Sequence, residues 1–379
     1  MIRFNNGGKV TPFGFDLPEE STTFKSIRSV LATNGRVLIA ARTRFGQQLG
    51  GDVPSHCKTI YVANQLVNEP ENSTNYEQQF LFFKTDNGDY RIANRQHGEV
   101  FQSNEATPEL PPGDSLITAP YNNNRRQQFG KFLYADERFR IFNDDGSITP
   151  CGDKGNSWTK ITMGANANEA RYVFEYGDTS IPITIPTKLE PTTLGPIPEL
   201  TNLDDFGKPP QPALVGSALL PCIFVNDRTP SQRIQDSPYY ILECYDYWKL
   251  ISSHVIPPND TAQWMEETGV HSGVQDNMRQ TIDMSIGSDK RLRYFNLSDP
   301  FRQSISRNIN ILRSDTGSDL SYTYGPNYHE NKTSGQLRYA KYYVAREFVL
   351  KKMNEDDPVH SWEYVDETRS VMKLYPRPI

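Results

Sequence analysis

A motif that occurs twice at a fixed spacing is the feature that most limits how this chain can fold. The stretch "YRIANRQHGEVF" begins at Tyr90, and the similar stretch "FRIFNDDGSITP" begins at Phe139, 49 residues later. The tripeptide "QQF" at 78–80 returns at 127–129 with the same displacement. Two separate landmarks that move together indicate a repeated structural unit.

One earlier copy is fainter, and the stretch after the second strong copy ends in a segment that resembles "QQF". "VLIAARTRFGQQL" from Val37 aligns its "IAAR" with the "IANR" of 92–95, and "ARYVFEYG" at 170–177 stands where a third tail is expected. Each copy consists of short apolar runs separated by Asn, Asp and Gly, which is the pattern of short strands and tight turns. The sequence therefore predicts three units of roughly 45–50 residues within 24–177.

Three such units are expected to fold together, because a single unit cannot bury its apolar face alone. They make a compact solution when their strands close one barrel and cap it with hairpins, which is a β-trefoil. The Gln-x-aromatic landmark resembles the Gln-x-Trp signature of ricin-B-type lectins, with Phe80 and Phe129 in place of Trp. In the third unit Tyr172 takes this position and Ala170 replaces the Gln. We expect an N-terminal β-trefoil, with a β-sandwich as the alternative.

The composition favours an all-β chain and excludes one class of partner. The 20 Tyr and 19 Phe suit half-buried pleated surfaces, and the 27 Pro and 25 Gly mark turns. A length of 379 residues fits two domains. The net charge of −6 provides no basic field for a phosphate backbone, so nucleic acid is not an expected partner.

A proline-rich stretch separates the two halves. Residues 182–212 contain eight prolines, so they can be neither a helix nor a central strand. We therefore expect a trefoil over 1–177 and a second domain over 178–379, with 182–212 as the connector. After it, "VGSALLPCIFVND", "SPYYILECYDYWKLI" and "QLRYAKYYVAREFVLKKM" are expected to be long strands of an antiparallel sheet. The last stretch also fits a helix over 339–353.

A lectin-type trefoil binds sugars with an Asp or Asn that accepts hydroxyl hydrogen bonds and an aromatic ring that stacks on the sugar. The third unit supplies the best candidates, Asp153, Trp158 and Asn168, and the second unit supplies Asn104 and Tyr121 as weaker counterparts. The alternative is structural, because turn Asp and Asn side chains usually satisfy backbone groups and a Trp is more often in the core.

The cysteines and the N-terminus exclude several further classes. Cys57, Cys151, Cys222 and Cys244 have no metal-type or redox-type spacing, so we expect no metal and no cofactor. Cys57 and Cys151 belong to the first and third units. A trefoil brings its units together around one axis, so a disulfide between these two cysteines is geometrically possible, and two buried thiols are the alternative. The N-terminus has no signal-peptide core, and no apolar run is long enough for a spanning helix.

Two stretches in the second half alternate between apolar and polar residues. "QTIDMSIGS" at 280–288 and "SISRNINIL" at 304–312 form a predicted amphipathic hairpin. Its apolar face consists of Ile282, Met284, Ile286, Ile305, Ile309 and Ile311. Such a hairpin commonly covers the core of a soluble sheet, but it is also what a transmembrane β-barrel needs. Arg307 interrupts this apolar face, so the membrane interpretation requires Arg307 at the tip of the hairpin or at the membrane interface.

The motifs "VGSALLPCIFVND", "SPYYILECYDYW" and "IPP" resemble the Bin-like insecticidal proteins of spore-forming bacilli, the Tpp group. The resemblance extends back to "FFKTDNGDYRIANRQHGEVF". It implies a lectin-like trefoil, an aerolysin-type pore-forming domain, production as an intracellular parasporal crystal and action at the insect midgut membrane. It also implies a glycan or glycolipid receptor, a homo-oligomer in the pore, a dimer in the crystal and, in some relatives, a second toxin component. Some relatives carry a trefoil disulfide, which Cys57 and Cys151 would form here.

An enzyme is the least favoured alternative. The sequence contains no HExxH, GxSxG, Walker or GxGxxG motif, and "YHENK" at 328–332 lacks a second His. A glycosidase that carries a lectin module usually needs a larger catalytic domain than residues 200–379 provide. The resemblance therefore implies a pore-forming insecticidal and mosquitocidal toxin, and the sequence offers no catalytic residues. A lectin or structural protein is the first alternative, and a glycosidase that carries a lectin module is the second.

Overall fold

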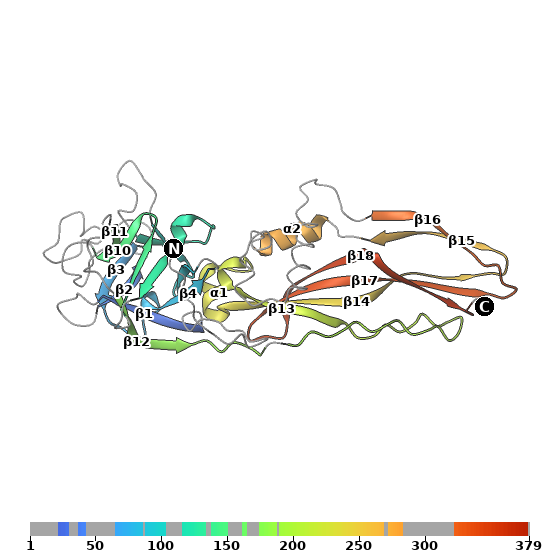
Figure 1. Ribbon diagram of the computed structural model, residues 1–379, viewed down its shortest axis with the longest axis horizontal. Coiled ribbons are helices and arrows are strands. Elements are labelled where there is room, and N and C mark those ends of the chain that lie inside the picture. The colour runs from blue at the N-terminus through green and yellow to red at the C-terminus, as the bar shows by residue number, and fades with distance from the viewer. Residues whose placement is uncertain are drawn as a thin grey trace.

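The chain folds into two β-rich halves arranged end to end in an elongated molecule (Figure 1). The structure is a computed structural model. It describes residues 22–29, 37–42, 65–85, 88–103, 116–133, 138–150, 161–164, 174–187, 189–268, 272–282 and 322–377.

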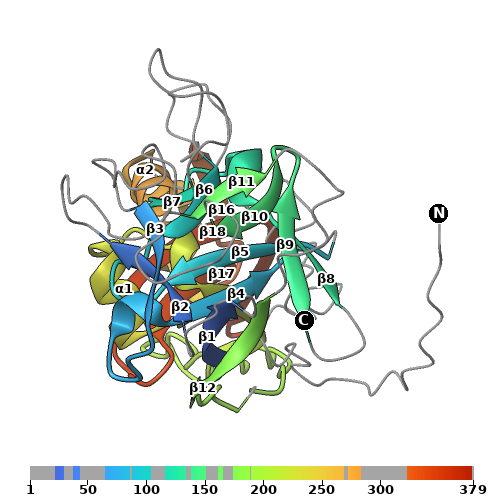
Figure 2. The same ribbon diagram turned by 90° about the vertical axis from the view of Figure 1, so that its left-hand side faces the viewer.

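Strands of the first half close a barrel. Its members are β1 (Thr23–Ser29), β4 (Phe80–Lys84), β5 (Tyr90–Asn94), β8 (Gly130–Leu133), β9 (Phe139–Asn143) and β12 (Phe174–Pro182). Around the barrel β1 pairs with β4, β4 with β5, β8 with β9, β9 with β12 and β12 with β1. A bridge between Tyr90 and Phe129 completes the ring between β5 and β8. The end-on view in Figure 2 looks at this half.

Hairpins between the barrel strands complete three similar units. They are β2 (Val37–Arg42) with β3 (Gln65–Pro70), β6 (Val100–Ser103) with β7 (Leu116–Ala119), and β10 (Gly146–Pro150) with β11 (Ile161–Gly164). Each described unit thus contributes two barrel strands and one hairpin, which is the arrangement of a β-trefoil. The trefoil prediction is confirmed, and the β-sandwich alternative is wrong.

The three units place matching residues at the barrel axis. Ile27, Ile92 and Ile141 are at most 1% exposed. Each lies two residues after a residue that pairs with the other barrel strand of its unit, and these pairs are Lys25 with Phe80, Tyr90 with Phe129 and Phe139 with Phe174. We call the second barrel strand of each unit, β4, β8 or β12, its closing strand. The paired aromatic residues Phe80, Phe129 and Phe174 lie at or directly before the start of a closing strand, and all three are fully buried. The third aromatic landmark is therefore Phe174, whereas the predicted Tyr172 lies outside the described residues.

The predicted alignment of the earliest copy is wrong. "IAAR" belongs to β2, a hairpin strand, whereas "IANR" begins in β5, a barrel strand. The unit that contains β2 instead begins with β1, where Lys25 pairs with Phe80 as Tyr90 pairs with Phe129. Both short runs start with Ile-Ala and end with Arg, so a local comparison cannot separate them.

The glutamine landmark connects each closing strand to the preceding hairpin. Gln78 ends the 3-10 helix η3 (Tyr76–Gln78), and its amide donates to the Pro70 carbonyl oxygen at 2.9 Å. Gln127 ends η4 (Arg125–Gln127) and donates to the Pro120 carbonyl oxygen at 2.8 Å. Both side chains are almost fully buried, so these bonds replace water that the groups lose on folding.

The second half is built on a long antiparallel sheet. Its order is β13 (Ala213–Pro221), β14 (Tyr239–Ile256), β17 (Leu337–Lys352) and β18 (Pro358–Tyr375). The second and third stretches that the sequence assigned to strands lie in β14 and β17. The first is a strand of this sheet only up to Pro221, after which Cys222–Phe224 form a 3-10 helix. The helix alternative for 339–353 is wrong, because β17 is central and its aromatic and β-branched side chains pack on both faces.

The remaining elements of this half lie beside the long sheet or at its trefoil end. The strands β15 (Thr261–Thr268) and β16 (Tyr322–Glu330) form a separate two-stranded sheet, and we call this pair the ribbon. The helices are η5 (Cys222–Phe224), α1 (Pro230–Asp236) and α2 (Ser272–Thr281). Figure 1 shows the ribbon and α2 above the long sheet, with α1 beside the trefoil.

The proline-rich connector packs on the sheet opposite the ribbon (Figure 1). None of its described residues after Pro182 and before Ala213 lies in a helix or strand, as predicted. Ile197 and Leu200 are buried against Tyr342. Trp248 donates its indole hydrogen to the Gly195 carbonyl oxygen at 2.8 Å, and the Tyr342 hydroxyl donates to the Gly207 carbonyl oxygen at 2.9 Å. The connector is therefore a fixed layer of the second half.

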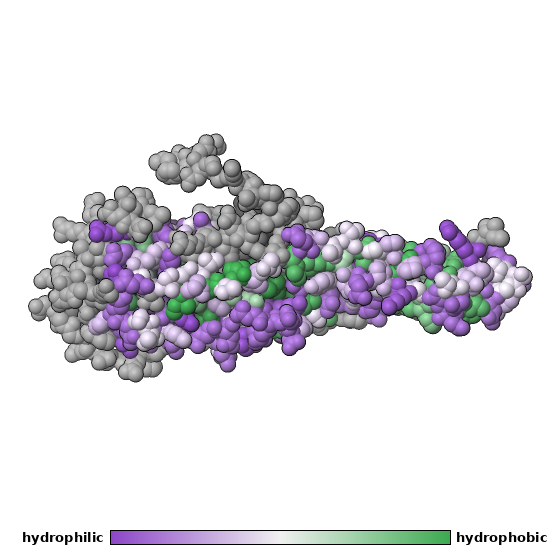
Figure 3. Space-filling view, turned by 90° about the horizontal axis from the view of Figure 1, so that it is seen from below, coloured by the Kyte–Doolittle hydropathy of each residue, from purple (hydrophilic) through white to green (hydrophobic). Residues whose placement is uncertain are grey.

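The predicted domain boundary falls inside a strand. β12 continues past residue 177 to Pro182 and pairs with β1 along this length. Beyond it, Ile183 and Ile185 are half-buried against the cluster that joins the two halves. Seen from below, hydrophobic residues gather near this junction and along the elongated half, between hydrophilic surfaces (Figure 3). The exact limits of the two domains remain a prediction.

Candidate functional site

Most residues that the sequence nominated for sugar binding lie outside the described residues. These are Asp153, Trp158, Asn168 and Asn104, and the same holds for the predicted disulfide partners Cys57 and Cys151. Tyr121 is the nominated sugar-binding residue that the structure describes. The sugar site and the disulfide remain predictions.

Tyr121 lies at the junction between the two halves. Its ring meets the Phe224 ring edge-on, with centroids 5.0 Å apart, and the Arg91 guanidinium lies 5.5 Å from the Tyr121 ring centroid. Its hydroxyl donates to the Asn123 side-chain oxygen at 3.2 Å. Phe224 belongs to the second half, so the Tyr121 ring contacts protein, whereas the ring of a sugar-binding site would contact the sugar. The second unit is therefore a weaker candidate than the third.

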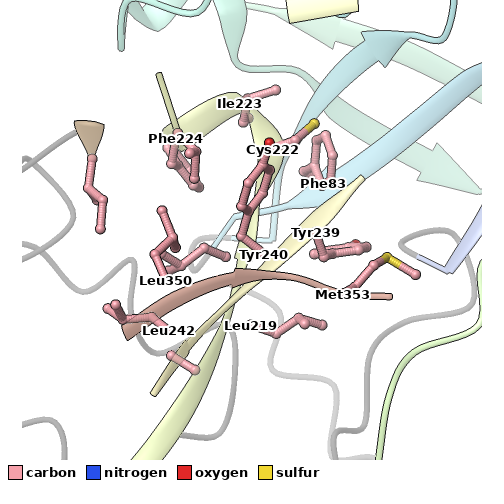
Figure 4. Packing of buried hydrophobic residues seen from close by; sticks show 14 of the residues in the cluster. Phe83, Leu219, Cys222, Ile223, Phe224, Tyr239, Tyr240, Leu242, Leu350 and Met353 are labelled. Atoms are coloured by element: carbon pink, nitrogen blue, oxygen red, sulfur yellow. The ribbon is translucent and has the colours of Figure 1, made fainter. Parts of the chain in front are cut away.

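A shared hydrophobic cluster joins the trefoil to the sheet. Phe83 from β4 meets Tyr239 from β14 edge-on at 5.6 Å, and both are buried in one cluster with Phe24 and Leu350. Figure 4 shows Phe83 pointing toward Cys222 and Tyr239. Burial raises the pKa of the Cys222 thiol to about 12, so it is a packed apolar group rather than a reactive one.

Helix α1 is docked on a turn of the trefoil. Thr229 and Gln232 form a capping box, and Pro230 occupies the first turn, so the sequence itself starts the helix here. The Ser231 hydroxyl donates to the Gln96 carbonyl oxygen at 2.7 Å. A Cβ atom at Gly98, whose φ is +70°, would lie 1.9 Å from the Pro230 carbonyl oxygen. Only glycine allows this approach.

The predicted amphipathic hairpin is described only at its first residues. Met284, Ile286, Ile305, Ile309 and Ile311 lie outside the described residues, so their membrane-facing role remains a prediction. Gln280 and Thr281, where a strand was expected, end helix α2. Ile282 is 4% exposed and forms a bridge with Val225, and the Asn226 amide donates to the Thr281 carbonyl oxygen at 2.7 Å. The segment thus starts from a buried anchor near the junction.

The ribbon and the long sheet belong to one folded-back ladder. β14 pairs with β17 up to Ile256 opposite Leu337, and β15 pairs with β16 from Thr261 opposite Glu330. The second pairing continues the first in the same nested order, after a corner formed by 257–260 and 331–336. Asn331 is fully buried at this corner and donates to the Ile256 and Pro257 carbonyl oxygens, each at 2.9 Å.

A buried carboxylate holds the ribbon against the sheet. Glu266 of β15 is 1% exposed and accepts hydrogen bonds from the Lys341 ammonium at 2.6 Å and the Tyr343 hydroxyl at 2.7 Å, both on β17. Its other oxygen accepts from the Trp264 indole at 2.8 Å and the Ser252 hydroxyl at 3.3 Å. We call these five residues the Glu266 clasp. Burial opposes ionisation, but the bonds from Lys341 and its neighbours keep the pKa of Glu266 below its ordinary value.

An aromatic stack lies next to this clasp. The rings of His254 and Trp264 are stacked with centroids 4.5 Å apart, and the Tyr339 ring lies 4.6 Å from Trp264. Burial, and then the nearby Arg338 charge, lowers the pKa of His254. Among the described residues its Nε2 atom is buried without a hydrogen-bond partner. The stack therefore favours neutral His254.

Sequence reasoning missed the clasp, although one signal was present. In "TAQWMEET" at 261–268, strand alternation puts Trp264 and Glu266 on the same face, and a Glu beside a buried Trp is unusual. The described residues contain no cluster of potential metal ligands. They also contain no helix that is both long and apolar enough to cross a membrane.

Comparisons with known proteins point to one group. The model of a family described as "Insecticidal Crystal Toxin, P42" matches residues 213–301. The chain is similar to the binary larvicide subunit BinB of Lysinibacillus sphaericus, with 29% identity over 97% of this chain and 82% of that protein. It is also similar to the subunit BinA from the same organism, with 26% identity over 79% of this chain and 81% of that protein.

The fold also matches a solved structure. The crystal structure of Cry35Ab1, an insecticidal crystal protein of Bacillus thuringiensis, superposes with a TM-score of 0.62 and covers 94% of this chain and 90% of that chain. Its sequence is 17% identical in this superposition, so this comparison supports the fold alone. By their descriptions, the relatives named here are two subunits of a larvicide and an insecticidal crystal protein.

Proposed function

Because this chain belongs to the Bin-like insecticidal crystal toxins, we propose that it acts by forming a β-barrel pore in the target-cell membrane. The trefoil binds a cell-surface glycan or glycolipid, several copies assemble, and residues 280–312 of each copy insert as a hairpin. Insecticidal action is common to its relatives, and the pore is our inference.

The folded-back ladder is the observation that carries this proposal. Straightening the corner at 257–260 and 331–336 would join β14 to β15 and β16 to β17 as two continuous strands, because the registers are already nested. Residues 280–312 lie between β15 and β16 in the chain, so they would form the far end of this long hairpin. A ladder that is already paired has less backbone entropy to lose on extension.

The residue pattern favours 280–312 as the part inside the membrane. One face of β15 carries Trp264 and Glu266 and the other carries Met265 and Glu267, so neither face of this strand is wholly apolar. The stretches at 280–288 and 304–312 alternate apolar with Ser, Thr, Asp or Asn residues. A membrane strand needs about 9–11 residues, and a closed barrel is required because unpaired edge groups are costly in lipid. The proposal therefore includes a homo-oligomer.

The trefoil provides the proposed receptor-binding part. Three-fold repetition offers one surface per unit, and in the second unit Tyr121 is covered by Phe224. We therefore assign the sugar to the third unit, with Asp153 and Asn168 as hydrogen-bonding groups and Trp158 as the stacking ring. A galactose-type glycan is the first ligand to test.

The names of the relatives suggest where the protein occurs and what accompanies it. We propose that it is made as an intracellular parasporal crystal and acts, after release, on midgut cells of an insect. BinA and BinB are described as subunits of a binary larvicide, so a second component of the same family is a candidate partner. Membrane leakage caused by the purified chain alone would remove the need for that partner.

Site-specific labels test the inserted hairpin. Cysteines introduced at Met284 and Ser285 are labelled with an environment-sensitive dye and mixed with liposomes that carry a galactose-terminated glycolipid. Because the two residues alternate, the label at Met284 should report lipid, and the label at Ser285 should stay accessible to aqueous quenchers. If both labels stay in water while the liposomes leak, the pore is formed by another segment. Binding without leakage would favour a lectin without pore activity.

Glycan arrays test the sugar site separately. Asp153→Ala and Trp158→Ala should each weaken binding to galactose-type glycans at least tenfold, because loss of one good contact of about 1.4 kcal/mol has this effect. Phe142→Ala is the matched control, since this aromatic residue of the same unit is 40% exposed and was not assigned to the site. Unchanged binding by both site variants would discard this assignment.

A further inference from the structure

We propose that the Glu266 clasp sets the rate at which the ribbon leaves the sheet, so that Glu266 acts as the release control of the toxin. This inference rests on the proposed function, because the ribbon must leave the sheet before the hairpin can extend. The partners of Glu266 are internal: the Lys341 ammonium and the Tyr343 hydroxyl on β17, the Ser252 hydroxyl on β14, and the Trp264 indole on β15 itself.

The described part of the ribbon is held by side chains and by the corner, with no backbone pairing to the long sheet. β15 and β16 pair only with each other within the described residues, whereas β13, β14, β17 and β18 form their own sheet. β15 nevertheless lies against β14 and β18. Separation of these layers would therefore break no ladder of the long sheet, and the side-chain contacts decide how firmly the ribbon is attached.

The clasp is the charged part of this contact. The Glu266 carboxylate is 1% exposed, and the Lys341 side chain is 21% exposed, so the pair is largely withdrawn from water. Ser252 on β14 and Tyr343 on β17 donate to the same carboxylate, which ties β15 to two strands of the sheet at once. Bonds to a charged acceptor are stronger than neutral ones. Next to the clasp, Trp264 and Tyr339 form an apolar contact with their neighbours, and the His254 and His329 rings lie against these two aromatic residues.

A buried ion pair suits a reversible attachment. Its net contribution is small, because desolvation offsets much of the attraction, and both groups regain water when the layers separate. Removal of one partner is costly, because the other charge is then left buried and unpaired. Loss of the Glu266 charge alone should thus favour the open ribbon, whereas loss of both charges should leave an apolar contact that stays closed.

A matched set of variants tests this idea. Glu266→Gln removes the buried charge at nearly constant shape. Glu267→Gln is the control, because it makes the same chemical change at the next residue, which is exposed on the opposite face of β15. The double variant Glu266→Gln with Lys341→Met removes both charges of the pair.

Two measurements are made on each full-length variant. Hydrogen exchange without membranes follows β15 and β16 separately from β14 and β17. Leakage from liposomes with a galactose-terminated glycolipid follows release in the presence of a membrane. For Glu266→Gln we expect exchange in the ribbon and leakage to be at least roughly tenfold faster, which corresponds to about 1.4 kcal/mol. Protection of β14 and β17 should be unchanged, Glu267→Gln should match the wild type, and the double variant should return toward it.

The outcomes separate this inference from the proposed function. If Glu266→Gln exchanges no faster than Glu267→Gln while the wild type leaks, the clasp is overturned and the pore stands. Protection lost throughout the long sheet would also overturn the clasp, because Glu266 would then support the whole domain. If the ribbon opens faster but no variant causes leakage, the clasp stands and the pore proposal fails.

Discussion

Substitution of Gly98 should loosen the contact between the trefoil and the second half. Gly98 has a φ of +70°, and an added Cβ would lie 1.9 Å from the Pro230 carbonyl oxygen and 2.8 Å from the Ser231 amide nitrogen. These are backbone atoms at the start of α1, so no rotation of a side chain can relieve the overlap. In Gly98→Ala, α1 must move away from the turn and lose the Ser231 bond to Gln96.

The magnitude follows from two separate terms. An alanine at positive φ costs about 1–2 kcal/mol. Overpacking against fixed neighbours costs about 1–3 kcal/mol more, so Gly98→Ala should lower the free energy of unfolding by about 2–5 kcal/mol. Gly88 provides a matched control, because its φ is +93° but no heavy atom lies within 4 Å of an added Cβ. Gly88→Ala should therefore carry the backbone term alone.

Urea unfolding of both variants separates the two terms. The free energy of unfolding should fall further in Gly98→Ala than in Gly88→Ala, by about 1–3 kcal/mol. Hydrogen exchange should accelerate in α1 and in the turn at 95–98 only in Gly98→Ala. Equal losses in the two variants, with α1 still protected, would refute the conclusion that this glycine permits the docking of α1.

Three further predictions follow from buried polar groups. Burial raises the pKa of Tyr339 and of Tyr342 to about 12, so their contribution to stability is present below pH 10 and should be lost as the pH rises toward 12; a flat thermal unfolding midpoint over this range would contradict it. Burial and then Arg338 lower the pKa of His254, and burial lowers the pKa of His329, so stability should be retained above about pH 6.5 and fall below it; His254→Gln should make that fall in thermal unfolding smaller, and an unchanged fall would contradict the role of His254. Gln127→Ala should lower the free energy of unfolding in urea by about 1–2 kcal/mol, because the buried Gln127 side chain and its hydrogen bonds to the Asn122 amide and the Pro120 carbonyl are lost, and a smaller change would assign the landmark another role.

The repeat could be predicted because it depends on local chemistry. Gln78 and Gln127 each end an Asn-capped 3-10 helix two residues before a buried Phe, so the same short motif produces the same contacts in both units. The earliest copy was misaligned because β2 and β5 have similar local sequences, and only long-range pairing distinguishes a hairpin strand from a barrel strand. Pairing between distant segments is the part that a single sequence leaves open.

The candidate site was predicted less well, for the same physical reason. The alternating pattern at 280–312 is local and predicts a hairpin directly; most of it lies outside the described residues, and at 280–281 the structure has the end of helix α2. The Glu266 clasp depends on Lys341, which lies 75 residues away in the chain and approaches only because the ladder folds back. The extended form of the connector followed from its prolines, but its attachment through Ile197 and Trp248 required the sheet beneath it.

A reversible cross-link between the ribbon and the sheet tests the central claim most directly. Ala262 on β15 and Leu374 on β18 pack in the same cluster, so cysteines at these positions can be joined by a short, reducible thiol linker. Bound to liposomes with a galactose-terminated glycolipid, the linked protein should bind normally but release no dye, and reduction of the linker should restore leakage. Leakage at the full rate while the linker is intact would contradict the account, because the pore would then form without release of the ribbon.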